Sequence, residues 1–440
     1  MKFVCYTFYL LFLFLLFSIS FSSLLTAGEE SFIVLPVLNT DPVQVSQEQK
    51  EIAENLYRQV VVAAENKQGL EAMRLAVQVI EANPEHEIVR RIFGFKLFHG
   101  QWRTDWEMNR LKKGFIDHPV FGWLPKEFVE PYESGKRMIP KLGWVSADED
   151  NKFHADIRNG WQIATEHYDL LTNHSLEEGV QMSRKLEHLY KAWKMLFFNM
   201  LFSEEKLAKL FLETLPSVPL PRHRVYVFRD KRDYVFFLKD SEQGFEAQLR
   251  ESNGFYHPQR FISYFFPVSC NMDEFDADTV RKALYHEGTH QLFQEARPKS
   301  NLPGVRNNFW IVEGMAMFME TFRIEGNQYK LGNQEDSRLF AAKAHRFEPE
   351  YLFYLPFEQT VALGRREFQT HPRLARLYSQ SAGMTHFLML YRNGKYRYAV
   401  FELLRQVYAG AVRPDTLSKL TGHSYQELDQ EYTEFLRTIP

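Results

Sequence analysis

Residues 284–293 read LYHEGTHQLF and hold two histidines four positions apart, His286 and His290. The surrounding segment, 278–297, lacks proline and repeats apolar residues at helical spacing, so we expect a helix whose N-cap is Asp278. Positions four apart share one face of a helix, and two imidazoles on one face can hold one zinc ion. Glu287 then stands beside the metal as a general base. The stretch therefore predicts a zinc-binding helix at the centre of the fold.

A catalytic zinc ion usually takes three protein ligands and leaves one position for water. The candidate third ligand is Glu313, which follows His290 by 313 − 290 = 23 residues in the otherwise apolar run FWIVEGMAMFME, 309–320. A carboxylate in such a run is costly to bury unless a cation or a hydrogen bond accompanies it. Glu320 lies about two helical turns further on, and we expect it to accept a hydrogen bond from the outer N–H of a ligand histidine.

The HExxH motif, followed by an EGxAxxxE motif that begins at Glu313, resembles the gluzincin zinc metallopeptidases. The resemblance implies that His286, His290 and Glu313 hold one Zn²⁺ ion per chain. It implies that Glu287 is the catalytic base and that the substrate is a peptide or a protein.

The same resemblance implies a side chain that donates a hydrogen bond to the oxyanion of the tetrahedral intermediate. Tyr378 is the candidate for this role, and His386 is the alternative. The flanking sequence looks more narrowly like a bacterial group of uncharacterised secreted gluzincin-like proteins. The features that carry this likeness are Gly-Trp at 122–123 and 143–144, TNHS at 172–175, GFY at 254–256 and YSQSAG at 378–383.

Two departures from the gluzincin pattern stand out. Gly288 lies inside the expected zinc helix, where glycine costs roughly 1 kcal/mol relative to alanine, so either surrounding packing holds the helix or something approaches its backbone closely. The chain also has no GxMEN run like that of the related aminopeptidases, which argues against simple amino-terminal exopeptidase activity.

The composition, with 45% hydrophobic and 25% charged residues, is that of a globular protein able to bury a core. The net charge of −3 predicts no nucleic-acid partner. The segments predict an α+β fold that is mainly helical. We expect a zincin-like catalytic domain with a small mixed sheet at 153–440, preceded by a small helical N-terminal domain.

Residues 1–28 read as a signal peptide, with Lys2 before an apolar run and small residues near Ala27. We therefore expect a secreted or periplasmic protein. The alternative is an uncleaved N-terminal anchor, because the run 3–25 is 25 − 3 + 1 = 23 residues long and can cross a bilayer. Only in that case do we expect contact with a membrane.

Residues 29–118 are expected to form the helical domain, because apolar residues recur at helical spacing between 53 and 80. A third helix is expected at 87–98. The helices resemble tetratricopeptide-type units, but with at most two weak units a small helical bundle is the preferred interpretation.

Residues 119–152 are rich in aromatic residues, glycine and proline, and we expect a linker element there. FGWL at 121–124 and LGWV at 142–145 look like two copies of a short aromatic element.

The catalytic region is expected to place several strands before the zinc helix, at 166–172, 224–228, 254–256 and 261–266. Strands in this position fit a metallopeptidase, in which an edge strand can pair with an extended peptide. The alternative is that they serve only to build the sheet.

The function that this sequence predicts is peptide-bond hydrolysis by a zinc-activated water, with Glu287 as general base. One rival is a catalytically inactive protein of the same fold that binds a partner through its helical N-terminal domain. Another is a zinc hydrolase that acts on a non-peptide amide. Cys270, the one cysteine outside the leader, is expected to be a buried thiol rather than a nucleophile.

Overall fold

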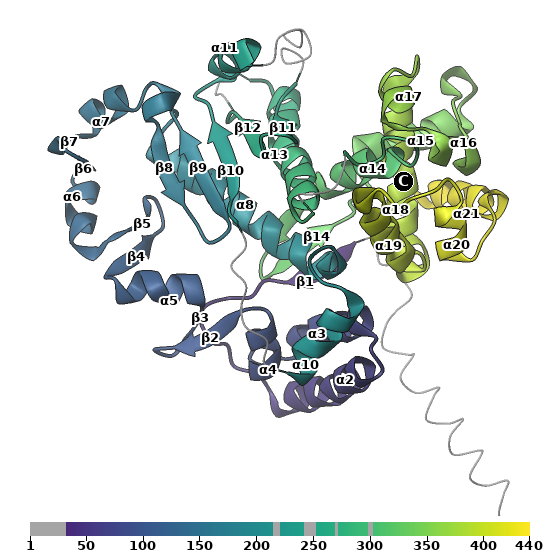
Figure 1. Cartoon of the computed structure of the whole chain (residues 1–440), viewed down its shortest axis with the longest axis horizontal. Helices are drawn as coiled ribbons and strands as arrows, with labels where there is room; N and C mark the ends of the chain where they lie inside the picture. Colours follow the sequence, from purple (N-terminus) through teal and green to yellow (C-terminus); the bar gives the residue numbers. More distant parts are fainter. Residues whose placement is uncertain (1–31, 214–220, 242–251, 269–271, 298–301) are drawn as a thin grey trace, which may run out of the picture.

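The computed structural model describes residues 32–213, 221–241, 252–268, 272–297 and 302–440 (Figure 1). The expected signal peptide and Cys270 lie outside the described residues. Within those ranges, no helix is both long enough and apolar enough to cross a membrane.

The expected fold class is confirmed, because the chain is a mainly helical α+β protein with a five-stranded mixed sheet. The strands are β8 Trp161–Ala164, β9 Tyr168–Thr172, β10 His223–Val227, β11 Phe255–His257 and β12 Ile262–Phe265. Their order in the sheet is β11-β12-β10-β9-β8. β10 runs parallel to both of its neighbours, and the two outer strands are antiparallel to theirs.

Helices cover both faces of this sheet. α8 Leu176–Leu196 and α13 Glu274–Glu295 pack side by side on one face, and α11 Lys231–Ser241 lies on the other. The alternation of side chains along β10 explains the division. Val225 enters the core shared with α8 and α13, whereas the ring of Tyr226 lies 6.0 Å from that of Phe237 on α11.

The zinc helix predicted from the sequence exists, but its predicted start is wrong. α13 begins four residues before Asp278, and its N-cap is Asp273, whose extended backbone (φ −69°, ψ 170°) lets its carboxylate accept from the N–H of Asp276. Asp278 lies inside the helix and forms an ion pair with Lys282.

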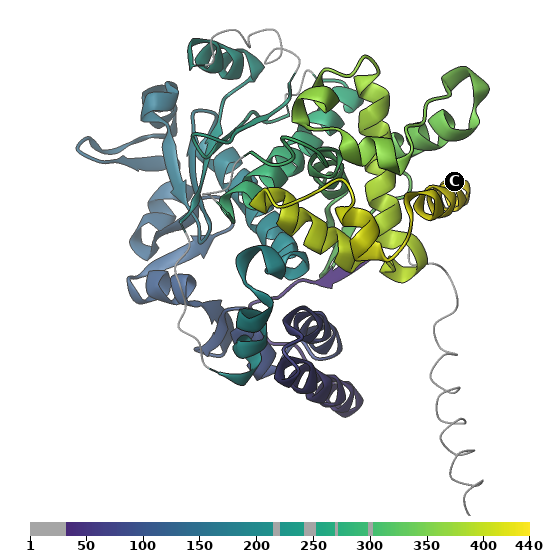
Figure 2. The ribbon, with the colours of Figure 1, turned by 45° about the vertical axis from the view of Figure 1, so that its right-hand side comes forward.

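The C-terminal half is a packed set of helices around α14 Trp310–Met319, all ten residues of which are buried. α14 contacts α13 on one side and α18 Leu374–Gly394 on the other. Figure 2, which is turned by 45° from the view of Figure 1, shows the C-terminal helices in front. The others are α15 Ser337–Phe347, α16 Phe357–Ala362, α17 Arg365–Gln369, α19 Arg397–Ala409, α20 Thr416–Thr421 and α21 Tyr425–Thr438.

The N-terminal helices are α2 Gln47–Glu65, α3 Gly69–Ala82 and α4 Glu87–Ile92. α10 Glu204–Leu212 packs on α2 and α3, so the small bundle takes a helix that follows α8 in the sequence. The predicted helix at 87–98 is wrong beyond Ile92. Gly94, at φ +99°, ends it, and the chain continues as a strand.

Three consecutive hairpin–helix units follow, and we call residues 95–153 the hairpin array. Each unit has two antiparallel strands and a short helix. The segment 119–152, which was expected to be a linker, supplies most of the second and third units. Trp102, Trp123 and Trp144 recur every 21 residues, because 123 − 102 = 144 − 123 = 21. The elements are β2 Phe95–Phe98, β3 Gln101–Thr104, α5 Asp105–Lys112, β4 Phe115–His118, β5 Gly122–Pro125, α6 Val129–Glu133, β6 Lys136–Ile139, β7 Gly143–Ser146 and α7 Ala147–Phe153.

The first described strand, β1 Ile33–Pro36, contacts α3 of the N-terminal bundle but belongs to a sheet with later strands. It pairs antiparallel with β14 Gln328–Leu331, which in turn pairs with β13 Arg323–Glu325. Ile33 and Leu35 are each only 4% exposed. The chain is therefore tied to the C-terminal half at its first described element.

Candidate metal centre

The metal-binding face of α13 can form because the opposite face packs closely on α8. A Cβ atom on Gly288 would lie 2.9 Å from Cδ2 of Leu189, on α8. The glycine in the HExxH motif thus permits a close approach of the two helices, one of the two explanations expected for it. On the other face of α13, His286 and His290 stand one turn apart with partly exposed side chains.

Glu313 on α14 completes a three-residue cluster with these histidines. The two Nε2 atoms are 3.1 Å apart, and Oε2 of Glu313 lies 3.5 Å from Nε2 of His286 and 3.6 Å from Nε2 of His290. Zinc bonds of about 2.0–2.1 Å at tetrahedral angles place ligand atoms about 3.3 Å apart. The observed separations bracket that value, so the cluster fits a zinc ion.

Glu320 lies behind His286 and fixes the orientation of its ring. A carboxylate can only accept, so Nδ1 of His286 donates to Oε1 of Glu320 over 2.7 Å and leaves Nε2 facing the cluster. Arg338, on α15, donates to both oxygens of Glu320 over 3.2 and 3.3 Å. Arg338 was not expected from the sequence, and no motif links it to α14.

The charges around the cluster favour a cation. Burial lowers the pKa of His286, but hydrogen bonds to Glu313 and Glu320 outweigh it and raise that pKa to about 10. Burial raises the pKa of Glu313, but the two histidines outweigh it and hold that pKa well below its usual value. Glu313 is only 7% exposed, and its ionised carboxylate therefore lies in a site that is nearly closed to water. Without a metal ion the protonated His286 balances this charge, and a bound metal ion would take the place of that proton.

Glu287 points to the edge of the sheet. Its Oε2 accepts from the backbone N–H of Tyr256 over 2.9 Å, and Tyr256 lies on β11, the outer strand beside β12. Gly254 permits this approach, because a Cβ atom there would lie 3.2 Å from Cγ of Glu287. The expected base therefore lies between the histidine cluster and an edge strand.

Tyr378 and His386 lie on the same helix, α18, but in different surroundings. Burial raises the pKa of Tyr378, and the charges of Glu313 and Glu287 raise it further, so the phenol lies within electrostatic reach of the cluster and of the expected base. His386 is 1% exposed, its Nδ1 bonds to the carbonyl of Ala382, and its ring lies 4.9 Å from that of Phe318. The two side chains are eight positions, about 12 Å, apart along the helix axis. Tyr378 thus lies within electrostatic reach of Glu313 and Glu287, whereas His386, buried in the core, lies within that of Glu320.

A residue that the sequence did not indicate, Arg365, also lies close to the cluster. Its guanidinium is stacked 4.5 Å from the centre of the Phe309 ring, just before α14. Burial lowers the pKa of Arg365, and the charge of Glu313 opposes that effect. Its Nε is buried and has no hydrogen-bond partner among the described residues. Arg365 is a cation beside the site with hydrogen-bonding capacity to spare.

Comparison with known proteins adds no relative to this picture. No protein-family model matches the chain, and no curated protein matches its sequence. The geometry of the cluster, a His-His-Glu site of the HExxH…E kind in a mainly helical α+β protein, carries the functional argument.

Proposed function

We propose that this protein is a zinc-dependent hydrolase, and specifically a peptidase of the gluzincin kind. The observation that carries the proposal is the tetrahedral fit of His286, His290 and Glu313, with the carboxylate of Glu287 beside it. Zinc bound there would polarise a carbonyl oxygen and lower the pKa of a bound water toward neutrality.

The residues around the cluster have separate parts in this proposal. Glu287 takes the proton from the attacking water and returns it to the leaving amine. Its hydrogen bond to the N–H of Tyr256 holds it at β11, the outer strand of the sheet among the described residues, where an extended peptide can add as a further strand. The scissile bond of such a peptide would then pass the base.

Near the cluster, Tyr378 supplies a hydrogen-bond donor and Arg365 supplies a positive charge. The raised pKa of Tyr378 means that its hydroxyl keeps its proton at neutral pH and can donate it in a hydrogen bond to the oxyanion. Arg365 adds a fixed positive charge close to Glu313 and Tyr378. We assign the oxyanion role to Tyr378 and a packing role to His386.

The test compares wild type with Glu287→Gln, using metal analysis and hydrolysis of an unfolded protein or a peptide library. We expect one zinc per chain in both proteins, and turnover lost by at least about a hundredfold in the variant, as for removal of a general base. Glu274→Gln is the matched control, because Glu274 is an exposed carboxylate at the other end of α13. An active Glu287→Gln protein would refute the mechanism.

A second candidate is a non-catalytic binding protein of the same fold. The observation that favours it is the hairpin array, whose third unit exposes 42% of Trp144. A chain that binds zinc but cleaves no peptide would support this candidate. Cleavage of small amides without cleavage of peptides would instead indicate a non-peptide substrate.

The leader at 1–28 leads us to propose that the protein works outside the cytoplasm, secreted or periplasmic, on a peptide or protein substrate. N-terminal sequencing of the protein recovered from its producing cell tests this. A first residue near Gly28 would show cleavage, and Met1 would indicate an uncleaved anchor.

A further inference from the structure

The hairpin array is built by one contact repeated between neighbouring units. Trp123 packs edge-on against Trp106 of the preceding unit at 5.3 Å, and Trp144 packs edge-on against Phe128 at 4.9 Å. The array then returns to the main sheet, where the first residue of β8, Trp161, lies 4.5 Å from the ring of His154 and donates to Asp150. Each tryptophan thus lies on the end of the unit before it, as in a linear repeat protein (Figure 1).

Arginines fill the spaces between these aromatic rings. Arg90 lies 5.1 Å from the ring of Trp102, and Arg110 lies 5.1 Å from Trp106 and 5.0 Å from Phe115. Arg137, on β6 of the third unit, lies over two rings of the second unit, Phe121 at 4.6 Å and Tyr132 at 5.0 Å. Guanidinium–aromatic stacking is therefore the packing rule of the array.

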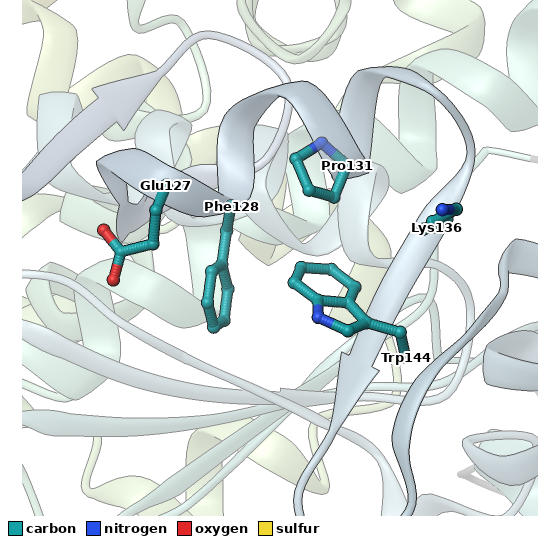
Figure 3. A pocket seen from close by; sticks show the side chains of 5 residues that line it. All are labelled: Glu127, Phe128, Pro131, Lys136 and Trp144. Atoms are coloured by element: carbon teal, nitrogen blue, oxygen red, sulfur yellow. The ribbon is translucent and has the colours of Figure 1, made fainter.

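The junction between the second and third units follows this rule only in part, because Arg137 covers Phe121 and Tyr132 but not the other rings there. Pro131 is the residue eight places after Trp123, the position that Arg110 holds relative to Trp102. No arginine or lysine among the described residues lies over Phe128 or Trp144. A hollow of about 420 Å³ is found there instead, between α6 and β6–β7 (Figure 3).

The walls of the hollow suit a cationic side chain. It is lined by Phe128, Pro131 and Trp144, with Glu127 at one end and Lys136 at the other (Figure 3). Glu127 is an exposed carboxylate next to Phe128, so it can pair with the charged end of a guest that lies against the rings. Lys136 disfavours a cation at the opposite end and so sets the direction in which the guest enters.

We propose that this hollow is a binding site for an arginine side chain of an extended polypeptide, which takes the place that Arg110 takes in the preceding unit. Because the array is anchored at β8, the outer strand of the main sheet opposite β11, the site is separate from the metal cluster. Binding at this hollow involves no catalytic step, so this proposal does not depend on the proposed function.

The test measures binding of a fluorescein-labelled peptide of four Gly-Gly-Arg repeats to the full chain by fluorescence anisotropy. A peptide with citrulline at each arginine position has nearly the same shape without the charge. We expect the arginine peptide to bind at least about threefold more tightly than the citrulline peptide. Equal binding of the two peptides would overturn the proposal.

Matched variants locate the site. Trp144→Ala and Glu127→Gln should each weaken binding about threefold or more. Leu142→Ala and Glu130→Gln should leave it unchanged, since Leu142 is 61% exposed on the same hairpin and Glu130 is an exposed carboxylate on α6, and neither lines the hollow. Equal losses in the test variants and the controls would refute the site.

Pro131→Arg gives a second test that removes no ring. The new side chain should fill the hollow from within, as Arg110 does one unit earlier, and abolish binding of the arginine peptide. Undiminished binding by this variant would overturn the proposal even if Trp144→Ala proved unstable.

Discussion

Glu320 is a single carboxylate that links the metal cluster to α15. It is 6% exposed and is held from two sides, by Nδ1 of His286 and by the guanidinium of Arg338. Burial raises its pKa, but these two partners outweigh burial and lower it, so Glu320 carries its charge at neutral pH. A charged acceptor makes the opposite nitrogen of His286 a stronger ligand.

Glu320→Gln should therefore weaken zinc binding by about 10- to 100-fold without removing a ligand. Titration of the metal-free protein against a zinc chelator of known affinity measures this. Glu325→Gln is the control, because Glu325 is a partly exposed carboxylate nearby, paired with Lys330 on the surface. An unchanged zinc affinity in Glu320→Gln would show that the hydrogen bond does not support the ligand.

At the scale of elements, the position of Glu313 depends on how closely two helices pack. A Cβ atom on Gly314 would lie 2.2 Å from Oγ1 of Thr385 and 2.8 Å from the carbonyl oxygen of Ser381, both on α18. α14 can therefore lie against α18 only without a side chain at this position.

Gly314→Ala should lower the free energy of unfolding by about 1–3 kcal/mol, because overpacking outweighs the helix propensity gained. It should also weaken zinc binding, since Glu313 is the preceding residue. Urea unfolding of the metal-free protein measures the first effect. Adding Thr385→Ala should restore part of the stability, and no recovery would show that the contact is not the cause.

Glu187 of α8 ties that helix to the start of β9. It accepts from both the backbone N–H and Nδ1 of His167, each over 2.8 Å. Burial raises the pKa of Glu187, but the charge and hydrogen bond of His167 outweigh it and lower that pKa to about 2. The unfolded chain then binds the proton more readily than the folded one, so this stability is complete above the unfolded pKa.

The contribution should be lost as the pH falls from about 4.5 toward about 2. Glu187→Gln should cost about 2 kcal/mol at pH 7 and progressively less below pH 4.5. Thermal unfolding across this pH range measures the difference from wild type, with the exposed Glu205→Gln as control. A difference that stayed constant with pH would contradict the assignment.

The sequence predicted the metal site better than it predicted the N-terminal elements, for physical reasons. Spacing along one helix places His286 and His290 together, and a carboxylate in an apolar run has few alternatives to a cation. Arg338 and Arg365 come from segments whose approach to the site depends on tertiary packing, so no local pattern marks them. The 21-residue spacing of the tryptophans was present in the sequence, but Trp102 lacks the preceding glycine of the other two units.

At the scale of the whole molecule, β1 is the element on which the two halves depend. A chain that begins at residue 32 keeps all of β1, and a chain that begins at residue 38 loses it together with the buried Ile33 and Leu35.

The shorter chain should lose about 3 kcal/mol or more, from two aliphatic side chains and four backbone pairings with β14. It should also tend to self-associate, because β14 becomes an exposed edge. Thermal unfolding and sedimentation of the two truncated chains measure both effects. Equal stability of the two chains would show that β1 does not contribute to the free energy of unfolding.

The pairing of β1 with β14 also sets the order in which the molecule can form. Leu331, the partner of Ile33, leaves the ribosome 331 − 33 = 298 residues after it. At about 5–20 residues per second, an apolar strand waits tens of seconds without its sheet. Closing so long a loop is slow, so the pairing of β1 with β14 should be a late step of folding. A chain interrupted before residue 328 would lack the partner strand of β1 and expose a segment on which chaperones and proteases act.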